Sequence, residues 1–254
     1  HGFNDGAAWR GKKALVIGVG TSAHDIAQDL CSHGADVRMV QRSPVTIVSA
    51  DAANLSHSIY YDEGVPIEDC DLITTSNAYP LAIRGAQMMT KRQNEIDREL
   101  LDKLHARGFR TDIGEDGTGY LMKVRRYHSG YYLNCGASDL IAEGKIGVID
   151  NADIERFVAE GALMKDGRIE PADLIVTATG YESPQEVVRD MMGSEIADKV
   201  GPIWGIAPDG ELNNMYRPTA QKGLWFLGSG FSQARIYSHF IALQIKAREI
   251  GILD

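Results

Sequence analysis

The hydrophobic positions of the first forty residues follow a strand pattern, then a helix pattern, then a strand pattern again. Residues 14–18 form a short apolar run, which predicts a buried strand. The next apolar residues recur at the spacing of one helix face: Ala23, Ile26, Ala27 and Leu30. His33-Gly34 is typical of a helix C-terminus, and Asp36–Gln41 predicts a second strand. The chain therefore opens with a β-α-β unit.

From about residue 49 to 130 the pattern becomes mainly helical. A long charged helix is predicted over Arg84–Arg107, and Gly108 ends it. Ile96, Leu100 and Leu104 are predicted to form its apolar face. Glu99 and Lys103 are predicted to form an i,i+4 ion pair. The many glycines of residues 112–119 predict a loop. We interpret residues 49–130 as a helical insertion rather than a separate domain.

The second half of the chain returns to strand patterns before a final helix. Strands are predicted over residues 146–149 and 154–158, with a hairpin turn at Asp166-Gly167. Asp173–Gly180 predicts a strand that runs into a glycine turn, and Leu224–Gly228 predicts another buried strand. The terminal helix is predicted over residues 232–250, with an apolar stripe of Ile236, Phe240, Leu243 and Ala247.

Composition narrows the possible partners. The 254 residues are 44% hydrophobic and 24% charged, as in ordinary globular proteins, and the formal net charge is -9. That charge repels polyphosphate backbones, so nucleic acid is not an expected partner. No apolar run is long enough to span a bilayer, and no secretory signal is visible. We therefore expect a cytoplasmic protein that does not bind membranes.

The cysteines and histidines do not predict a metal site. The three cysteines, Cys31, Cys70 and Cys135, are far apart and form no C-x-x-C motif. The seven histidines show no H-x-x-x-H or similar ligand spacing. We therefore expect reduced thiols and no structural metal.

A glycine turn links the first strand to the first helix. Gly18, Gly20 and Ala23 form the pattern G-x-G-x-x-A, in which the first glycine permits the tight turn and the second lets a pyrophosphate approach the backbone. The small third residue allows close packing of helix on strand. The N–H groups that begin the helix, from Thr21 and Ser22 onward, would face the phosphates. The turn predicts a dinucleotide site, and the alternative is a structural turn without a ligand.

The residues after the second predicted strand indicate which nucleotide is bound. An acidic residue at this place accepts the ribose 2′-hydroxyl of NAD, but the chain has Gln41-Arg42-Ser43. Arg42 can pair with a 2′-phosphate, and Ser43 can add a hydroxyl donor. We therefore predict NADP(H) rather than NAD. The alternative is that Arg42 is only a solvated strand end.

The same turn superficially resembles the G-x-S-x-G nucleophile elbow of hydrolases, with Ser22 as the nucleophile. His24 stands where the final glycine of that elbow belongs, and the elbow does not account for Gly18. The sequence therefore favours nucleotide binding over hydrolysis.

A second turn, Ala178-Thr179-Gly180-Tyr181, follows the strand that begins at Asp173. Small residues here let the chain pass close to a bound cofactor, although an ordinary strand exit is the alternative. With His1 and Trp9 ahead of Gly18, the order of features resembles the flavin-containing monooxygenases and their Baeyer–Villiger relatives. In that family an F-x-G-x-x-x-H-x-x-x-[FW] fingerprint precedes the NADPH turn, and an A-T-G-[FY] linker returns the chain to the FAD domain.

The linker is matched residue for residue, whereas the fingerprint is matched only at His1, because Trp9 lies eight residues later instead of four. The resemblance implies an α/β fold: a Rossmann-like NADPH-binding domain with a helical insertion over residues 1–180, and the C-terminal tail of an FAD-binding domain over residues 181–254. A single G-x-G-x-x-[GA] turn implies that the chain is the C-terminal portion of a longer flavoprotein. Gly228, before the last helix, occupies the place where such proteins contact the flavin, and the alternative is a plain strand–helix turn.

The resemblance also implies the activity. NADPH would reduce FAD, and one oxygen atom of O2 would pass to a small organic substrate, with no side chain of this segment identified as catalytic. The alternative is a nucleotide-binding module or remnant without turnover. A disulfide reductase would need a C-x-x-C motif, and a short-chain dehydrogenase a Y-x-x-x-K pair; neither is present. A face left open by an absent FAD-binding part would favour a homo-oligomer.

Overall fold

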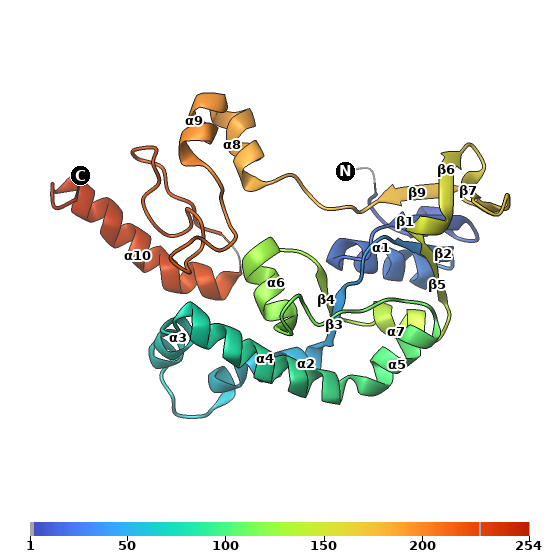
Figure 1. Ribbon diagram of the computed structural model, residues 1–254, viewed down its shortest axis with the longest axis horizontal. Helices are drawn as coiled ribbons and strands as arrows, with labels where there is room; N and C mark the ends of the chain where they lie inside the picture. The colour runs from blue at the N-terminus through green and yellow to red at the C-terminus, as the bar shows by residue number, and fades with distance from the viewer. Residues whose placement is uncertain (1–2, 229, 254) are drawn as a thin grey trace. The chain divides into compact units, whose positions relative to one another are not determined.

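The computed structural model describes residues 3–228 and 230–253, so His1 and Ser229 lie outside the described residues (Figure 1). The chain forms two compact units. The first holds residues 3–62, Ile83–Val124 and Ser129–Gly180. The second holds Glu63–Ala82, Arg125–His128 and residues 181–253.

A parallel sheet of four strands is the centre of the first unit, in the order β5-β2-β1-β9. The strands are β1 (Lys13–Ile17), β2 (Asp36–Gln41), β5 (Ile146–Asp150) and β9 (Leu174–Thr177). Helix α1 (Thr21–Ser32) connects β1 to β2, as the β-α-β pattern predicts. All four strands and α1 therefore match their predicted positions within a few residues, and the α/β class with a parallel sheet is confirmed.

The two faces of this sheet bury different residues, as the two-residue period of strands requires. On one face, Ala14 and Val16 pack with α1, α5 (Arg98–Ala106) and α7 (Ala137–Ala142). On the other face, Leu15 packs with residues of β6 (Ile154–Val158) and β7 (Gly161–Met164), which form an antiparallel sheet with β8 (Ile169–Pro171). The hairpin predicted at Asp166-Gly167 joins β7 to β8. Short 3-10 turns, η1 (Ala7–Trp9) and η3 (Asn151–Asp153), precede β1 and β6.

Two short parallel strands flank the helical middle of the chain. β3 (Thr46–Ser49) pairs in parallel with β4 (Tyr131–Asn134). The segment between them is helical, as expected: α2 (Ala50–Asn54), η2 (Leu55–Tyr61), α3 (Ile67–Thr75), α4 (Tyr79–Ile96), α5, and α6 (Gly119–Tyr127). Residues 112–118 form the predicted loop.

The single helix predicted over Arg84–Arg107 is wrong, because the structure divides it into α4 and α5 at Asp97. The Asp97 carboxylate is buried and accepts the backbone N–H of Ser49 at 2.8 Å, which ties the break to the end of β3. Leu104 is buried as predicted, but Ile96 is 54% exposed because it precedes the break. The Glu99–Lys103 pair forms at 2.6 Å.

The second unit contains α8 (Pro184–Met192), α9 (Ser194–Val200) and α10 (Phe231–Glu249), the last as predicted. The strand predicted over Leu224–Gly228 is wrong. Only Phe226 forms an isolated bridge, to Met215, while Leu224, Trp225 and Phe226 pack as an irregular segment on the core of this unit. An apolar run of five residues fits either arrangement, because both bury it.

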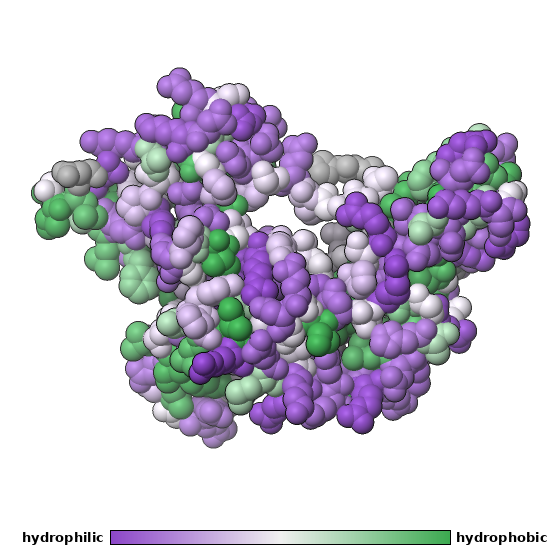
Figure 2. Space-filling model, in the orientation of Figure 1, coloured by the Kyte–Doolittle hydropathy of each residue, from purple (hydrophilic) through white to green (hydrophobic). Residues whose placement is uncertain are grey.

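The predicted stripe of α10 is also incorrect. Ile241 is the buried residue of this helix, whereas Phe240 is 52% and Leu243 68% exposed. Hydrophobic side chains gather over the C-terminal end of α10 in the space-filling view (Figure 2). The helix is apolar around much of its circumference, so periodicity alone does not identify its buried face. None of the described helices combines the length and apolar composition that a membrane crossing needs.

Candidate functional site

The glycine turn lies at the carboxyl end of the parallel sheet. Gly18 has a φ of +126°, and a Cβ there would stand 2.3 Å from the carbonyl oxygen of Ala178. The N–H of Gly18 donates to the Val40 oxygen at 3.0 Å, and the N–H of Ala178 donates to the Ile17 oxygen at 2.8 Å. The structure therefore brings Gly18 and Ala178 together, and the fold itself requires glycine at position 18.

Gly20 is different, because nothing in the described chain requires a glycine there. It is the N-cap of α1 with a φ of −81°, and a Cβ would meet no atom within 4 Å. No side chain caps the helix, and its first turn carries no acidic residue. The N–H groups that open the helix, those of Thr21, Ser22 and Ala23, precede its first internal hydrogen bonds. Space beside the backbone and uncapped donors are the two features that a pyrophosphate needs.

His24 follows this turn, and sequence reasoning gave it no part in nucleotide binding. It is fully buried; its ring stacks on Tyr132 at 4.0 Å and meets Phe109 edge-on at 5.7 Å. Both its backbone N–H and its ring Nδ1 lie within hydrogen-bond distance of the Gly20 oxygen, at 3.0 and 3.1 Å. Burial lowers the pKa of His24 to about 4, so the ring is neutral at pH 7. A neutral Nδ1–H therefore donates to Gly20 and fixes the direction of its carbonyl.

The three residues after β2 have distinct environments. The Gln41 amide is buried; its Nε2 donates to the Arg110 oxygen at 2.7 Å and its Oε1 accepts the Arg110 N–H at 2.8 Å. Arg42 and Ser43 are exposed. Across the described residues, the Arg42 guanidinium forms no ion pair, which leaves it available to a ligand. The Gln41 amide thus fixes the backbone of Arg110, while Arg42 and Ser43 face solvent.

Two further charged residues lie at this edge, and the sequence offered no local signal for either. One is Arg110, which lies between α5 and α6, within the helical segment that separates β3 from β4. Its Nη2 donates to the Arg42 oxygen at 3.0 Å, and its Nη1 pairs with Asp150 at 3.2 Å. The other is Asp150, the last residue of β5. The register of β2 with β5, which a single sequence does not reveal, places Asp150 opposite Gln41.

The remaining predicted residues divide between the two units. Thr179 and Gly180 are exposed after β9, and Gly180 has a φ of +104°. Tyr181 and Gly228 belong to the second unit, where Tyr181 is 90% exposed. The Tyr216 hydroxyl donates to the Gly228 oxygen at 2.9 Å, and burial raises the pKa of Tyr216 to about 12. That hydroxyl therefore stays a proton donor at neutral pH.

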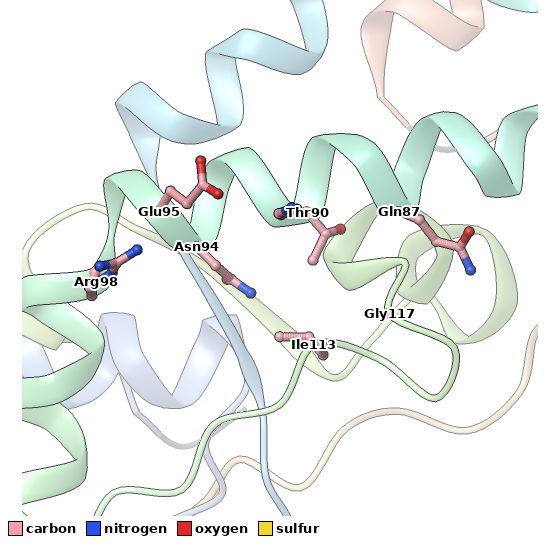
Figure 3. Close-up of a pocket in the computed structure, with 8 residues that line it drawn as sticks. Gln87, Thr90, Asn94, Glu95, Arg98, Ile113 and Gly117 are labelled. Carbon is pink, nitrogen blue, oxygen red and sulfur yellow. The ribbon is translucent and has the colours of Figure 1, made fainter.

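A groove of about 360 Å³ lies elsewhere in the first unit and shares no residue with the predicted site (Figure 3). Side chains of α4 and Arg98 line one wall, and the loop with Ile113 and Gly117 forms the other. Its charged residues are of both signs, Lys91 and Arg98 against Glu95. That mixture singles out no class of ligand, so the glycine turn remains the candidate site.

Comparisons with known proteins give sequence relatives and structural neighbours of one kind. No family model matches the chain. The indole-3-pyruvate monooxygenase YUCCA1 of Oryza sativa subsp. japonica is 27% identical over 184 residues, which cover 71% of this chain and 39% of that protein. The probable indole-3-pyruvate monooxygenase YUCCA7 of Arabidopsis thaliana is 28% identical over 182 residues, covering 71% and 37%. The match therefore spans about two fifths of the length of these relatives.

Among solved structures, an oxidized steroid monooxygenase bound to NADP superposes with a TM-score of 0.53 at 16% identity, covering 95% of this chain and 54% of that one. At this identity the likeness shows the fold alone. Together the comparisons confirm the predicted resemblance to the flavin-containing and Baeyer–Villiger monooxygenases.

Proposed function

We propose that this chain is the NADPH-binding portion of an FAD-dependent monooxygenase that reduces flavin with NADPH and transfers one oxygen atom from O2 to a small organic substrate. The observation that carries the proposal is Gly20: a glycine that the fold does not need, on the uncapped N-terminus of α1. Binding of a pyrophosphate against the backbone explains why a side chain is absent there.

The residues around the turn fit NADPH at two points. The open backbone at Gly20 and the first N–H groups of α1 would hold the pyrophosphate. The exposed Arg42 guanidinium at the end of β2 would pair with the 2′-phosphate, and the Ser43 hydroxyl would add a donor. Ala178, Thr179 and Gly180 would let the chain pass beside the nucleotide. The first compact unit ends at Gly180, where the proposed Rossmann-like domain ends, while residues 63–82 and 125–128 of the helical insertion belong to the second unit.

FAD binding by the protein rests on the named relatives and on the place of Gly228 before α10. When bound, FAD supplies the acceptance of hydride and the reaction with oxygen, while protein residues bind and orient the reactants. In this chain Tyr216 holds the Gly228 carbonyl and so sets the direction of the backbone that would contact a flavin.

The first test is Gly20→Val, measured as NADPH affinity by calorimetry. A valine meets no protein atom within 4 Å at Cβ, so the variant should fold, but its side chain would occupy the pyrophosphate space. We expect at least a hundredfold weaker binding. Gly85→Val is the matched control, because Gly85 also has open space at Cβ and lies in α4, away from the turn. Undiminished NADPH binding by folded Gly20→Val would contradict the proposal.

The oxygenase part is tested separately on the purified chain. Protein that retains yellow FAD and oxidises NADPH faster than buffer supports the proposal. Colourless protein that binds NADPH without oxidising it, even with added FAD, would leave only the nucleotide-binding module. The substrate would then be sought by adding small ketones, sulfides or amines and measuring NADPH consumption.

A further inference from the structure

The carboxyl end of the sheet contains an acidic residue, but on a different strand from the one where an acid selects NAD. Asp150 ends β5, and its Cα is the register partner of Gln41, the residue before Arg42. Neighbouring strands are about 4.8 Å apart, so the Asp150 carboxylate lies close to the region of a ribose bound at the end of β2. An unpaired carboxylate there would repel a 2′-phosphate and accept a 2′-hydroxyl.

Arg110 stands between this carboxylate and the Arg42 backbone. Its Nη1 pairs with the Asp150 carboxylate at 3.2 Å, and its Nη2 donates to the Arg42 oxygen at 3.0 Å. The Arg110 backbone is fixed independently, because its N–H and carbonyl both bond the buried Gln41 amide, at 2.8 and 2.7 Å. The guanidinium is thereby held at one place although its side chain is 43% exposed.

The two arginines at this edge therefore have different tasks. In the described part of the chain, Arg42 has no acidic partner, whereas the Arg110 charge is matched by Asp150. We infer that Arg110 is a specificity-determining residue: by neutralising Asp150, it keeps the site open to the 2′-phosphate of NADPH, which Arg42 then binds. This inference rests on the proposed NADPH site and names a residue that acts through another.

A double-mutant cycle on the full chain tests the inference, with dissociation constants for NADPH and NADH measured by calorimetry at fixed ionic strength. Arg110→Gln should weaken NADPH binding about tenfold or more, because a free carboxylate then faces the phosphate. NADH binding should stay within about twofold or improve. Asp150→Asn alone should change either constant by less than about threefold, since Asn can still accept the Ala152 N–H that Asp150 accepts at 2.9 Å.

The double variant Arg110→Gln/Asp150→Asn should recover most of the lost NADPH affinity, because no carboxylate is left to neutralise. Arg168→Gln is the matched control: it removes the same charge from an ion pair of 2.7 Å with Asp166, at the β7–β8 turn. Circular dichroism confirms the fold of each variant before binding is measured.

Three results overturn the inference. If Arg110→Gln weakens NADPH and NADH equally, Arg110 has only a structural role. If the double variant binds NADPH as weakly as Arg110→Gln does, Arg110 contacts the phosphate itself. If Arg110→Gln changes neither dissociation constant, Asp150 does not act on the ligand. Failure of the proposed function is distinct, because the unaltered chain would then bind neither nucleotide.

Discussion

His24 is a buried residue that fixes the backbone of the glycine turn. Its backbone N–H and its ring Nδ1 both approach the Gly20 carbonyl, and its ring is enclosed by Tyr132 and Phe109. Within the described residues, Nε2 is buried and has no hydrogen-bond partner, so a proton on Nε2 would find no acceptor. The ring is therefore compatible only with the neutral form that donates through Nδ1.

This environment predicts a stability that depends on pH. Burial lowers the pKa of His24 from 6.5 to about 4, so between these values the unfolded chain binds a proton that the folded chain rejects. The free energy of unfolding should be fully retained above pH 6.5 and fall as the pH drops toward 4, by roughly 3 kcal/mol in total. Urea unfolding at pH 7, 5.5 and 4.5 measures the change.

The control for this prediction is His24→Phe, which keeps an aromatic ring against Tyr132 but cannot titrate. Its free energy of unfolding should depend less steeply on pH than that of the parent chain. His57, whose pKa burial also lowers, contributes equally to both proteins and cancels in the comparison. Parallel pH curves for the two proteins would contradict the assignment to His24.

At this scale the sequence predicts residues that belong to a local motif and misses those that arrive from elsewhere. Gly18, Gly20 and Arg42 lie in one short stretch, so their spacing alone predicted a turn and a strand end. Arg110 and Asp150 join them only through the register of β2 and β5 and through the Gln41 amide. Such pairings depend on long-range strand order, which one sequence does not contain.

At the scale of elements, short strands with clear boundaries were predicted well. β2 has the predicted bounds, and the β7–β8 hairpin follows its Asp-Gly turn, because local chemistry decides both. The α4–α5 break was missed because Glu95, Arg98 and Glu99 favour a helix on both sides of Asp97. There the tertiary contact with Ser49 overrides helix propensity.

The hydrogen bond from the Ser49 N–H to Asp97 predicts a measurable contribution to the free energy of unfolding. Asp97→Ala leaves the Ser49 N–H without its acceptor at a partly buried place, and we expect a loss of about 1–3 kcal/mol in the free energy of unfolding. Asp97→Asn keeps an acceptor oxygen and should lose less than half as much. Urea unfolding at pH 7 compares the three proteins. Equal stability of Asp97→Ala and the parent chain would show that the break does not depend on this bond.

For the molecule as a whole, the division into two units has a consequence for ligand binding. Every residue assigned here to the pyrophosphate and 2′-phosphate regions, from Gly18 to Arg42 and Arg110, belongs to the first unit. Each unit also has a hydrophobic core of its own. The tryptophans divide in the same way: Trp9 packs on the core of the first unit, and Trp204 and Trp225 pack on the core of the second.

This distribution predicts that NADPH stabilises the two units unequally. At a hundred times its dissociation constant, a ligand raises the stability of the unit that binds it by about 2.7 kcal/mol. The variant Trp204→Phe/Trp225→Phe retains Trp9, whose fluorescence follows thermal unfolding of the first unit. Its unfolding midpoint should therefore rise by several degrees with NADPH. The midpoint of Trp9→Phe, which reports on the second unit, should rise much less. Equal shifts would mean that the units unfold as one cooperative structure, and no shift in either would mean that the chain does not bind NADPH.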